Sequence, residues 1–250
     1  MIERAHSSHI GLNACIRRAR EAIFWPNMSS DITKYVQKCS ICEQVQSESQ
    51  REPMLSRELP SRPWQYVATD MFEFKQQSYL ITVDYFSNYF EIDRLEGKRA
   101  VDIIYRLKKL FCAQGLPEKV FSDNGPPFNS IEFREFVKNY EFQHVTSSPY
   151  YAQSNGKIER SVQTAKKLMK KASVDNSDPF LALLDFRNTP SESLKLSPVQ
   201  ILYGRRTRTK LPIKSELLTT PDASDIQSRL GSAKVKQAMY TTAGLNQKNH

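Results

Sequence analysis

Residues 119–126 read KVFSDNGP, a stretch in which an apolar strand runs directly into a tight turn. Val120 and Phe121 carry the strand pattern, and the Ser-Asp-Asn-Gly-Pro run supplies residues that turns prefer. Ligands of open α/β sheets bind outside the carboxyl ends of the strands, so Asp123 lies where a binding site would form. Turn chemistry explains the same aspartate equally well, and the stretch by itself leaves both interpretations open.

Strand-like and helical runs alternate on both sides of this stretch. The strand-like runs cover residues 66–74, 78–85, 89–95, 119–122 and 142–146. The first three are joined by short polar turns, which indicate an antiparallel meander. Helical patterns cover residues 100–114, 130–140, 156–173, 179–187 and 198–203. This order predicts an α/β fold with a mixed sheet flanked by helices.

The first strand-like run contains a carboxylate that needs an explanation. Asp70 stands within an otherwise apolar strand, where a charge is costly unless it is paired or bound to a cation. Phosphodiester chemistry without a covalent protein intermediate uses two hard divalent cations, held by carboxylates from different elements of one sheet. Asp70 and Asp123 are therefore candidates for such a cation site.

A third carboxylate opens the long amphipathic helix predicted over residues 156–173. Its apolar face is defined by residues spaced three and four apart, namely Ile158, Val162, Ala165, Met169 and Ala172. Glu159 lies on the opposite side, at the head of a polar row formed by Gln163, Lys166, Lys167 and Lys170. Such a row could hold DNA phosphates next to a metal-binding carboxylate. A basic helix face is more often simply solvated, which is the alternative interpretation.

Two close pairs of metal-ligating residues bound a short helical segment near the N-terminus. His6-x-x-His9 and Cys39-x-x-Cys42 offer four zinc ligands to a segment too small to be stabilised by burial alone. A structural zinc ion would contribute folding energy there. The alternatives are a redox Cys-x-x-Cys motif and surface histidines that bind nothing. Cys15 and Cys112 are expected to be helical core residues without a chemical role.

Composition narrows the class of partner. The 250 residues carry a formal net charge of +9, which favours a polyanionic partner, and no separate basic amphipathic helix points to a membrane surface. No apolar run is long enough for a spanning helix or a signal peptide, so a cytosolic or nuclear protein is expected. A polar, proline-containing stretch over residues 44–63 is typical of a linker.

The combination of motifs resembles the integrases of Gypsy-class LTR retrotransposons and, more distantly, those of retroviruses. The residues that carry the likeness are His6-x-x-His9-x-Gly11, Phe24-Trp25-Pro26, Cys39-x-x-Cys42, Ala68-Thr69-Asp70, Val83-Asp84-Tyr85-Phe86-Ser87, Phe121-Ser122-Asp123-Asn124-Gly125-Pro126, Gln153-Ser154-Asn155-Gly156, Glu159-Arg160, Leu196-Ser197-Pro198 and Tyr203-Gly204-Arg205-Arg206. Between Asp123 and Glu159 lie 35 residues, the gap that marks this family. The likeness extends from about His6 to Pro212.

The resemblance implies an RNase H-like catalytic core preceded by a small helical His2Cys2 zinc-binding domain. Asp70, Asp123 and Glu159 would bind two Mg²⁺ or Mn²⁺ ions, which would serve trimming of element DNA ends and their joining to target DNA. Asp84 is the rival carboxylate of the second strand. Residues expected to contact DNA are Gln153 and Asn155, in what resembles the mobile active-site loop, and Arg160, Lys166, Lys167, Arg205 and Arg206.

The domain boundaries expected from this likeness are 1–52 for the zinc-binding domain, 53–62 for the linker, 63–214 for the catalytic core and 215–250 for a polar tail. The expected setting is a homo-multimer on double-stranded DNA in the nucleus, with cytoplasmic assembly as an option and no membrane association. The chain departs from the family pattern at Pro127 and Ala152, and the residues before His6 are few, so the zinc-binding domain is expected to be N-terminally truncated.

Two other functions stay open at this level. A domesticated or truncated remnant would bind DNA through its basic residues without catalysis, and its binding would survive loss of the carboxylates. A ribonuclease H acting on hybrid duplexes would share the fold but leave the zinc module without a purpose.

Overall fold

The computed structural model describes residues 1–44, 60–146, 152–219 and 232. They belong to two compact units, Arg57–Lys166 and a second unit that combines Met1–Ser56 with Lys167–His250. Residues 167–214, which the sequence assigns to the catalytic core, group here with the zinc-binding segment, and the domain boundaries stay a prediction. The two units are described separately below.

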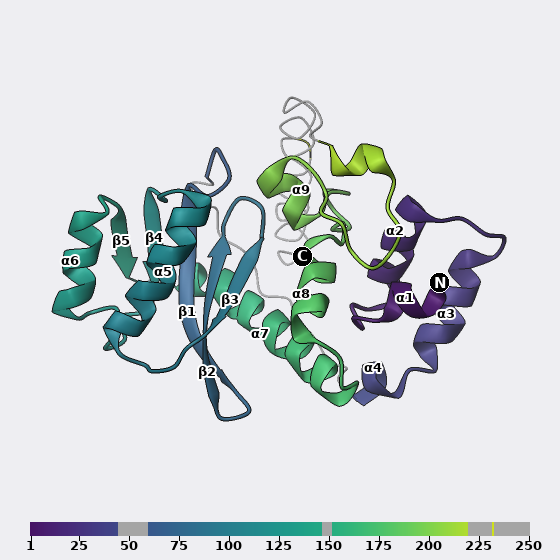
Figure 1. Cartoon of the computed structure of the whole chain (residues 1–250), viewed down its shortest axis with the longest axis horizontal. Coiled ribbons are helices and arrows are strands. Elements are labelled where there is room, and N and C mark those ends of the chain that lie inside the picture. Colours follow the sequence, from purple (N-terminus) through teal and green to yellow (C-terminus); the bar gives the residue numbers. More distant parts are fainter. Residues whose placement is uncertain (45–59, 147–151, 220–231, 233–250) are drawn as a thin grey trace, which may run out of the picture. The chain divides into compact units, whose positions relative to one another are not determined.

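The Arg57–Lys166 unit is built on one five-stranded sheet (Figure 1). Its strands are β1 (Tyr66–Phe74), β2 (Gln77–Asp84), β3 (Phe90–Arg94), β4 (Lys119–Ser122) and β5 (Gln143–Thr146), in the order β3-β2-β1-β4-β5. The β1–β2 and β2–β3 pairs are antiparallel, whereas the β1–β4 and β4–β5 pairs are parallel. The predicted mixed sheet that begins with a meander is therefore confirmed.

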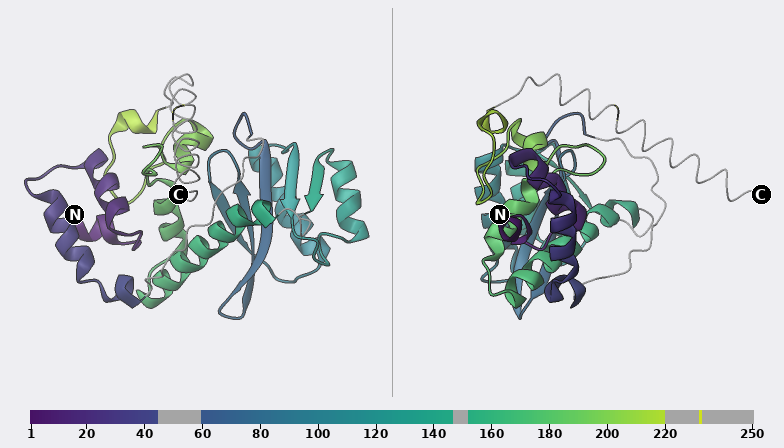
Figure 2. Two further views of the ribbon diagram at one scale, coloured as in Figure 1. Left: turned by 180° about the vertical axis from the view of Figure 1, so that it is seen from behind. Right: turned by 90° about the vertical axis from the view of Figure 1, so that its right-hand side faces the viewer.

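Helices cover both faces of this sheet. Helix α5 (Ala100–Gln114) lies on one face and the first part of α7 (Ala152–Val174) on the other, as the front and back views show (Figures 1 and 2). Helix α6 (Ile131–Asn139) begins where Ser130 Oγ accepts the Phe133 amide at 3.1 Å. Phe133 and Phe136 of α6 are buried, and Phe136 stacks on Phe111 of α5 with ring centroids 5.9 Å apart. Burying each such side chain contributes roughly 1.5–3 kcal/mol to folding.

The second unit is helical. Its N-terminal part contains α1 (Ile2–His6), α2 (Leu12–Ala22), α3 (Met28–Gln37) and α4 (Ser40–Gln44). Its C-terminal part contains the end of α7, α8 (Pro179–Arg187), α9 (Pro198–Tyr203) and the short 3-10 helix η2 (Ser215–Leu218). The buried apolar cluster of the N-terminal helices consists of Ala5, Cys15, Ala19, Met28, Ile32, Val36 and, from the C-terminal part, Leu211.

Buried ion pairs join the two parts of this helical unit. Arg18 of α2 pairs with Asp185 of α8, and Asp185 also accepts the hydroxyl of Ser8. Arg206 pairs with Glu21 of α2 and is only 1% exposed. Removing one partner of a buried pair costs on the order of 3–5 kcal/mol, because the other charge stays buried without compensation. These pairs explain why α8 and the segment after α9 cluster with the N-terminal helices.

Within the described ranges, no helix combines the length and apolar character that crossing a bilayer requires.

Candidate active site and metal centre

Strand register brings Asp70 and Asp123 to neighbouring positions. Ala68 of β1 is paired with Phe121 of β4 in the parallel ladder, and each aspartate lies two residues further along its own strand direction. Side chains two residues apart on a strand point to the same face, so both carboxyl groups leave the sheet on the same side. Because β4 ends at Ser122 while β1 continues to Phe74, the edge beyond Asp123 opens into a cavity.

All three predicted carboxylates line that cavity. Its volume is about 200 Å³, and its described lining consists of Ala68, Thr69, Asp70, Phe121, Ser122, Asp123, Ile158 and Glu159. Glu159 comes from α7, on which the apolar face predicted from the spacing is largely buried and Lys166, Lys167 and Lys170 are exposed. The structure therefore gathers a strand aspartate, an aspartate at a strand end and a helix glutamate around one space.

The electrostatics of the cavity favour a bound cation. Burial, together with the charges of Asp123 and Glu159, raises the pKa of Asp70 to about 6, although the Met71 amide and Lys166 act in the opposite direction. The Met71 amide donates to Asp70 Oδ1 at 2.7 Å. A divalent cation would relieve the repulsion among the three carboxylates, and hard carboxylate oxygens are the ligands that Mg²⁺ and Mn²⁺ prefer. The donor set fits such ions.

The turn that carries Asp123 is fixed by contacts that the sequence did not reveal. Ser122 Oγ donates to the Asp123 carbonyl at 2.7 Å and lies 2.8 Å from Nε2 of His144 on β5. The Gly125 amide donates to Asp123 Oδ1 at 3.1 Å, and a Cβ at Gly125 would lie 3.0 Å from that oxygen. A side chain at position 125 would therefore have to displace the Asp123 carboxylate by a few tenths of an ångström. His144 carried no motif, so only the pairing of β4 with β5 brings it to the site.

Asp84, the alternative candidate for the cation site, has a structural role. It is fully buried and accepts hydrogen bonds from the amides of Trp64 at 3.0 Å and Ser87 at 2.9 Å, and from the Ser87 hydroxyl at 2.5 Å. A carboxylate with this many donors is satisfied without a metal. Asp84 does not line the cavity of Asp70 and instead holds the turn after β2 against the segment before β1.

The residues predicted to contact DNA fall into different environments. Arg160, Lys166, Lys167 and Arg205 are exposed, and Lys166 Nζ lies 5.7 Å from the centroid of the Phe72 ring. Arg206 must be corrected, because its buried guanidinium is bound by Glu21, the Asn188 carbonyl and Gln200 Oε1, which leaves it unavailable to a phosphate. Composition could not distinguish this arginine from its exposed neighbour.

Gln153 and Asn155 also differ from expectation in their secondary structure. Helix α7 begins at Ala152, so both residues lie in its first turns and not in a loop. Their side chains lie outside the described part of the chain, as do residues 147–151 of the expected loop.

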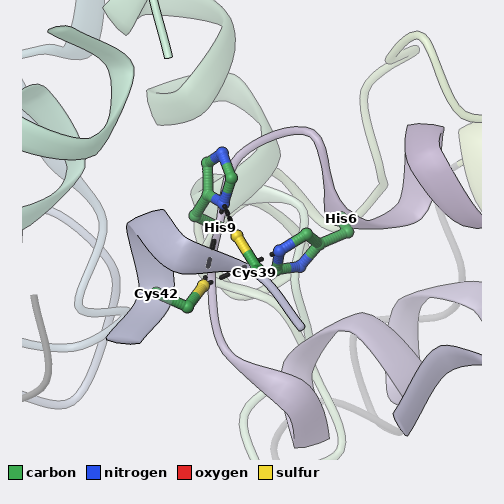
Figure 3. Close-up of side chains that lie close together, drawn as sticks. All are labelled: His6, His9, Cys39 and Cys42. Atoms are coloured by element: carbon green, nitrogen blue, oxygen red, sulfur yellow. Dashed lines mark hydrogen bonds between the residues drawn. The ribbon is translucent and has the colours of Figure 1, made fainter. Parts of the chain in front are cut away.

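The four predicted zinc ligands come together in the helical unit (Figure 3). His6 ends α1, His9 follows it, Cys39 lies between α3 and α4, and Cys42 is in α4. Cys39 Sγ is 3.3 Å from His9 Nδ1, and Cys42 Sγ is 3.7 Å from both His9 Nδ1 and His6 Nε2. All four ligand atoms lie within 4.8 Å of one another, which confirms the predicted cluster.

These distances suit a tetrahedral zinc ion. Zinc bonds of about 2.0–2.1 Å to nitrogen and 2.3 Å to sulfur place the two ligand atoms roughly 3.6 Å apart. Burial and the nearby His9 and Lys171 lower the pKa of His6 to about 4, so its imidazole is neutral, as a ligand must be. Burial raises the pKa of the Cys42 thiol to about 11, and a bound cation would be needed to stabilise its thiolate.

Comparison with known proteins agrees with this geometry. Residues 1–48 match the model of the integrase zinc binding domain, and residues 60–152 match that of the integrase core domain. The chain therefore contains a retroviral-type zinc-binding domain with two histidines and two cysteines, followed by an integrase catalytic core of RNase H-like fold.

Individual relatives extend the likeness beyond these two domains. Over 239 residues the chain is 29% identical to an uncharacterized protein of Caenorhabditis elegans, covering 92% of the chain and 19% of that protein. Over 258 residues it is 30% identical to the Gag-Pol polyprotein of baboon endogenous virus, covering 95% of the chain and 14% of the polyprotein. The chain thus spans about a fifth or less of the length of these relatives.

A solved structure supports the fold. One chain of the simian T-cell lymphotropic virus intasome in complex with PP2A regulatory subunit B56 gamma superimposes with a TM-score of 0.53 at 22% identity. The match covers 89% of this chain and 78% of that chain.

Proposed function

We propose that this chain is a retroelement integrase that trims DNA ends and joins them to a target duplex. The observation that carries the proposal is the convergence of Asp70, Asp123 and Glu159 on one cavity. Two Mg²⁺ or Mn²⁺ ions bound there would supply Lewis acidity to the scissile phosphate and lower the pKa of the attacking hydroxyl or water.

The chain's own residues would set the geometry of this reaction. Asp70 lies on β1 and Asp123 directly follows the adjacent strand β4, so the two would hold their ligand oxygens in fixed relation, while Glu159 would approach from α7. The exposed lysines of α7 would bind the phosphates on either side of the reacting bond. The positive charge of Lys166 lowers the pKa of Asp70, so this lysine acts on the carboxylate site electrostatically.

The test is an end-joining assay with the full chain, Mg²⁺ or Mn²⁺ and a labelled duplex that ends in the element's terminal sequence. Asp123→Asn should reduce trimming and joining by about 10³-fold or more, because the metal's contribution of several kcal/mol is lost. Glu135→Gln, which removes an exposed carboxylate of α6, is the matched control and should leave the rates unchanged. Product formation that Asp123→Asn does not affect would refute the proposal.

The second candidate function is DNA binding without catalysis, because the exposed lysines of α7 would bind phosphates whether or not the carboxylates hold a metal. It would show salt-sensitive duplex binding that survives Asp70→Asn and Asp123→Asn, with no joined product from the unaltered chain. A ribonuclease H would instead cleave hybrid duplexes, and it would not need the zinc centre that the helical unit provides.

We further propose that the chain belongs to the Gypsy-class integrases, acts on double-stranded DNA as a homo-multimer and works in the nucleus. The motif likeness from His6 to Pro212 supports the class. The multimer follows from the reaction itself, because two element ends must be joined together. The charge of +9 supports the polyanionic partner.

A further inference from the structure

Each zinc-binding histidine has a second ring nitrogen, and both of these nitrogens face a group outside the four-residue motif. His6 turns Nε2 toward Cys42, and its Nδ1 lies 3.5 Å from Cys15 Sγ. His9 does the reverse, because Nδ1 faces the two cysteines and Nε2 lies 3.3 Å from Asp175 Oδ2. The two imidazoles therefore use opposite nitrogens toward the metal position.

The outer nitrogen of His9 is the one that needs a partner. His9 is only 6% exposed, and no hydrogen bond of standard geometry reaches its Nε2 from the described residues. The Asp175 carboxylate is the acidic group that faces this nitrogen, and a small movement of its half-exposed side chain would complete the bond. When Nδ1 binds a metal, Nε2 carries the proton and must donate it to an acceptor.

A neighbouring lysine holds the same residue by its backbone. Lys171 Nζ donates to the His9 carbonyl at 2.5 Å, and His9 has a left-handed φ of 50°, which is uncommon for a residue with a side chain. Asp175 directly follows α7 and is fixed there by a 2.9 Å bond from its amide to the Lys171 carbonyl. The end of α7 thus contacts His9 at both its ring and its backbone.

We propose that Asp175 and Lys171 are positioning residues of the zinc centre, with Asp175 accepting the Nε2–H of His9 so that Nδ1 faces the metal. The proposal rests on zinc binding by His6, His9, Cys39 and Cys42. Outer partners of this kind fix the tautomer and ring orientation of a ligand and raise its basicity. The zinc centre is then assembled from two stretches of chain that lie more than a hundred residues apart in sequence, and the N-terminal segment does not complete it alone.

The test measures metal affinity in the full chain by Co²⁺ titration, which reports tetrahedral coordination by its visible absorption, and by Zn²⁺ competition with a chromophoric chelator. Asp175→Ala should weaken Zn²⁺ binding by about 10–100-fold. The Zn²⁺ affinity of Asp175→Asn should lie between those of the unaltered chain and Asp175→Ala, because the amide oxygen still accepts the Nε2–H but lacks the charge. Glu192→Gln, an exposed carboxylate change in the same unit, is the control and should bind like the unaltered chain.

The lysine is tested by the same titration. Lys171→Met should weaken Zn²⁺ binding several-fold, whereas Lys170→Met, the exposed lysine beside it, should not. Nitrogen-15 NMR of the zinc-loaded unaltered chain provides a readout that needs no variant: His9 should show a metal-bound Nδ1 and a protonated Nε2.

These outcomes distinguish the positioning role of Asp175 from zinc binding by the four ligands. Tetrahedral Co²⁺ binding whose affinity is unchanged by Asp175→Ala, or a His9 that binds through Nε2, would overturn the role of Asp175 and leave the zinc centre intact. Absence of a tetrahedral signal in the unaltered chain would overturn the zinc centre and the positioning role with it. Loss of affinity in Asp175→Ala together with an unchanged circular dichroism spectrum of the metal-free protein would support the proposal.

Discussion

In the His–Cys quartet all four ligand atoms lie within 4.8 Å of one another, whereas Asp70, Asp123 and Glu159 line a cavity of about 200 Å³. Both histidines are buried, but Glu159 is exposed. A structural ion completes a closed tetrahedron and needs close ligands, while a pair of catalytic ions about 3.5–4 Å apart spreads its ligands and keeps positions open for substrate. Burial of the histidines and the cavity beside the carboxylates therefore distinguish the proposed structural site from the proposed catalytic site.

The comparison predicts that loss of a zinc ligand damages the fold more than any other change. Cys42→Ala should unfold the N-terminal helices, because binding of a structural zinc is worth about 10–16 kcal/mol in small zinc-binding peptides. Hydrogen exchange of residues 1–44, with and without a strong chelator, measures the effect. Cys112→Ala should leave exchange unchanged, because Cys112 is exposed on α5 and does not lie in the core as its sequence predicted. Equal protection in Cys42→Ala and the unaltered chain would show that the quartet is not structural.

The buried ion pairs predict the next largest effect, since they join the zinc-binding helices to the segment that follows α7. Arg206→Met should lower the free energy of unfolding by about 3–5 kcal/mol, because Glu21 would lose its partner. Arg205→Met removes the exposed neighbouring arginine and should cost less than ~0.5 kcal/mol. Urea denaturation of both variants gives the two values. A similar loss of stability in both variants would mean that the Arg206–Glu21 pair does not hold the two parts of the helical unit together.

The two metal sites also differ in how far local sequence predicts them. His6 with His9, and Cys39 with Cys42, are visible because each pair is close in the chain, and Asp70 is visible because an acid in an apolar strand is anomalous. The apolar face of α7 follows from its spacing. Local sequence could not identify Cys15, Asp175 or His144. Each of them reaches its site only because the fold packs separate elements together, and no short motif records that packing. Arg206 was assigned to the surface for the same reason, since its partner Glu21 is distant in sequence.

Asp70→Asn should separate stability from activity at the carboxylate site. Three like charges around a half-buried cavity repel one another, so replacing one by a neutral amide should leave the metal-free protein as stable as before, or raise its melting temperature by about 2–4 °C for each kcal/mol gained. Joining activity should disappear with the ligand. Addition of Mg²⁺ should raise the melting temperature of the unaltered chain but not of Asp70→Asn, as differential scanning fluorimetry would show. A destabilised Asp70→Asn would indicate that Asp70 holds the fold, as Asp84 does.

The smallest expected effect concerns the cations beside the carboxylates. Lys166→Ala should weaken duplex binding by a few-fold and reduce the slope of log affinity against log salt by about 1, because one phosphate contact is lost. Lys109→Ala, an exposed lysine of α5 on the other face of the sheet, should change neither quantity. Fluorescence anisotropy over a range of salt concentrations gives both values. Because Lys166 lowers the pKa of Asp70, its loss would also strengthen the repulsion among the carboxylates. Because a positive charge that competes with the cation is removed, we expect the Mg²⁺ concentration needed for half-maximal joining to fall in Lys166→Ala and to stay constant in Lys109→Ala. Equal salt slopes in the two variants would place the DNA path elsewhere on the chain.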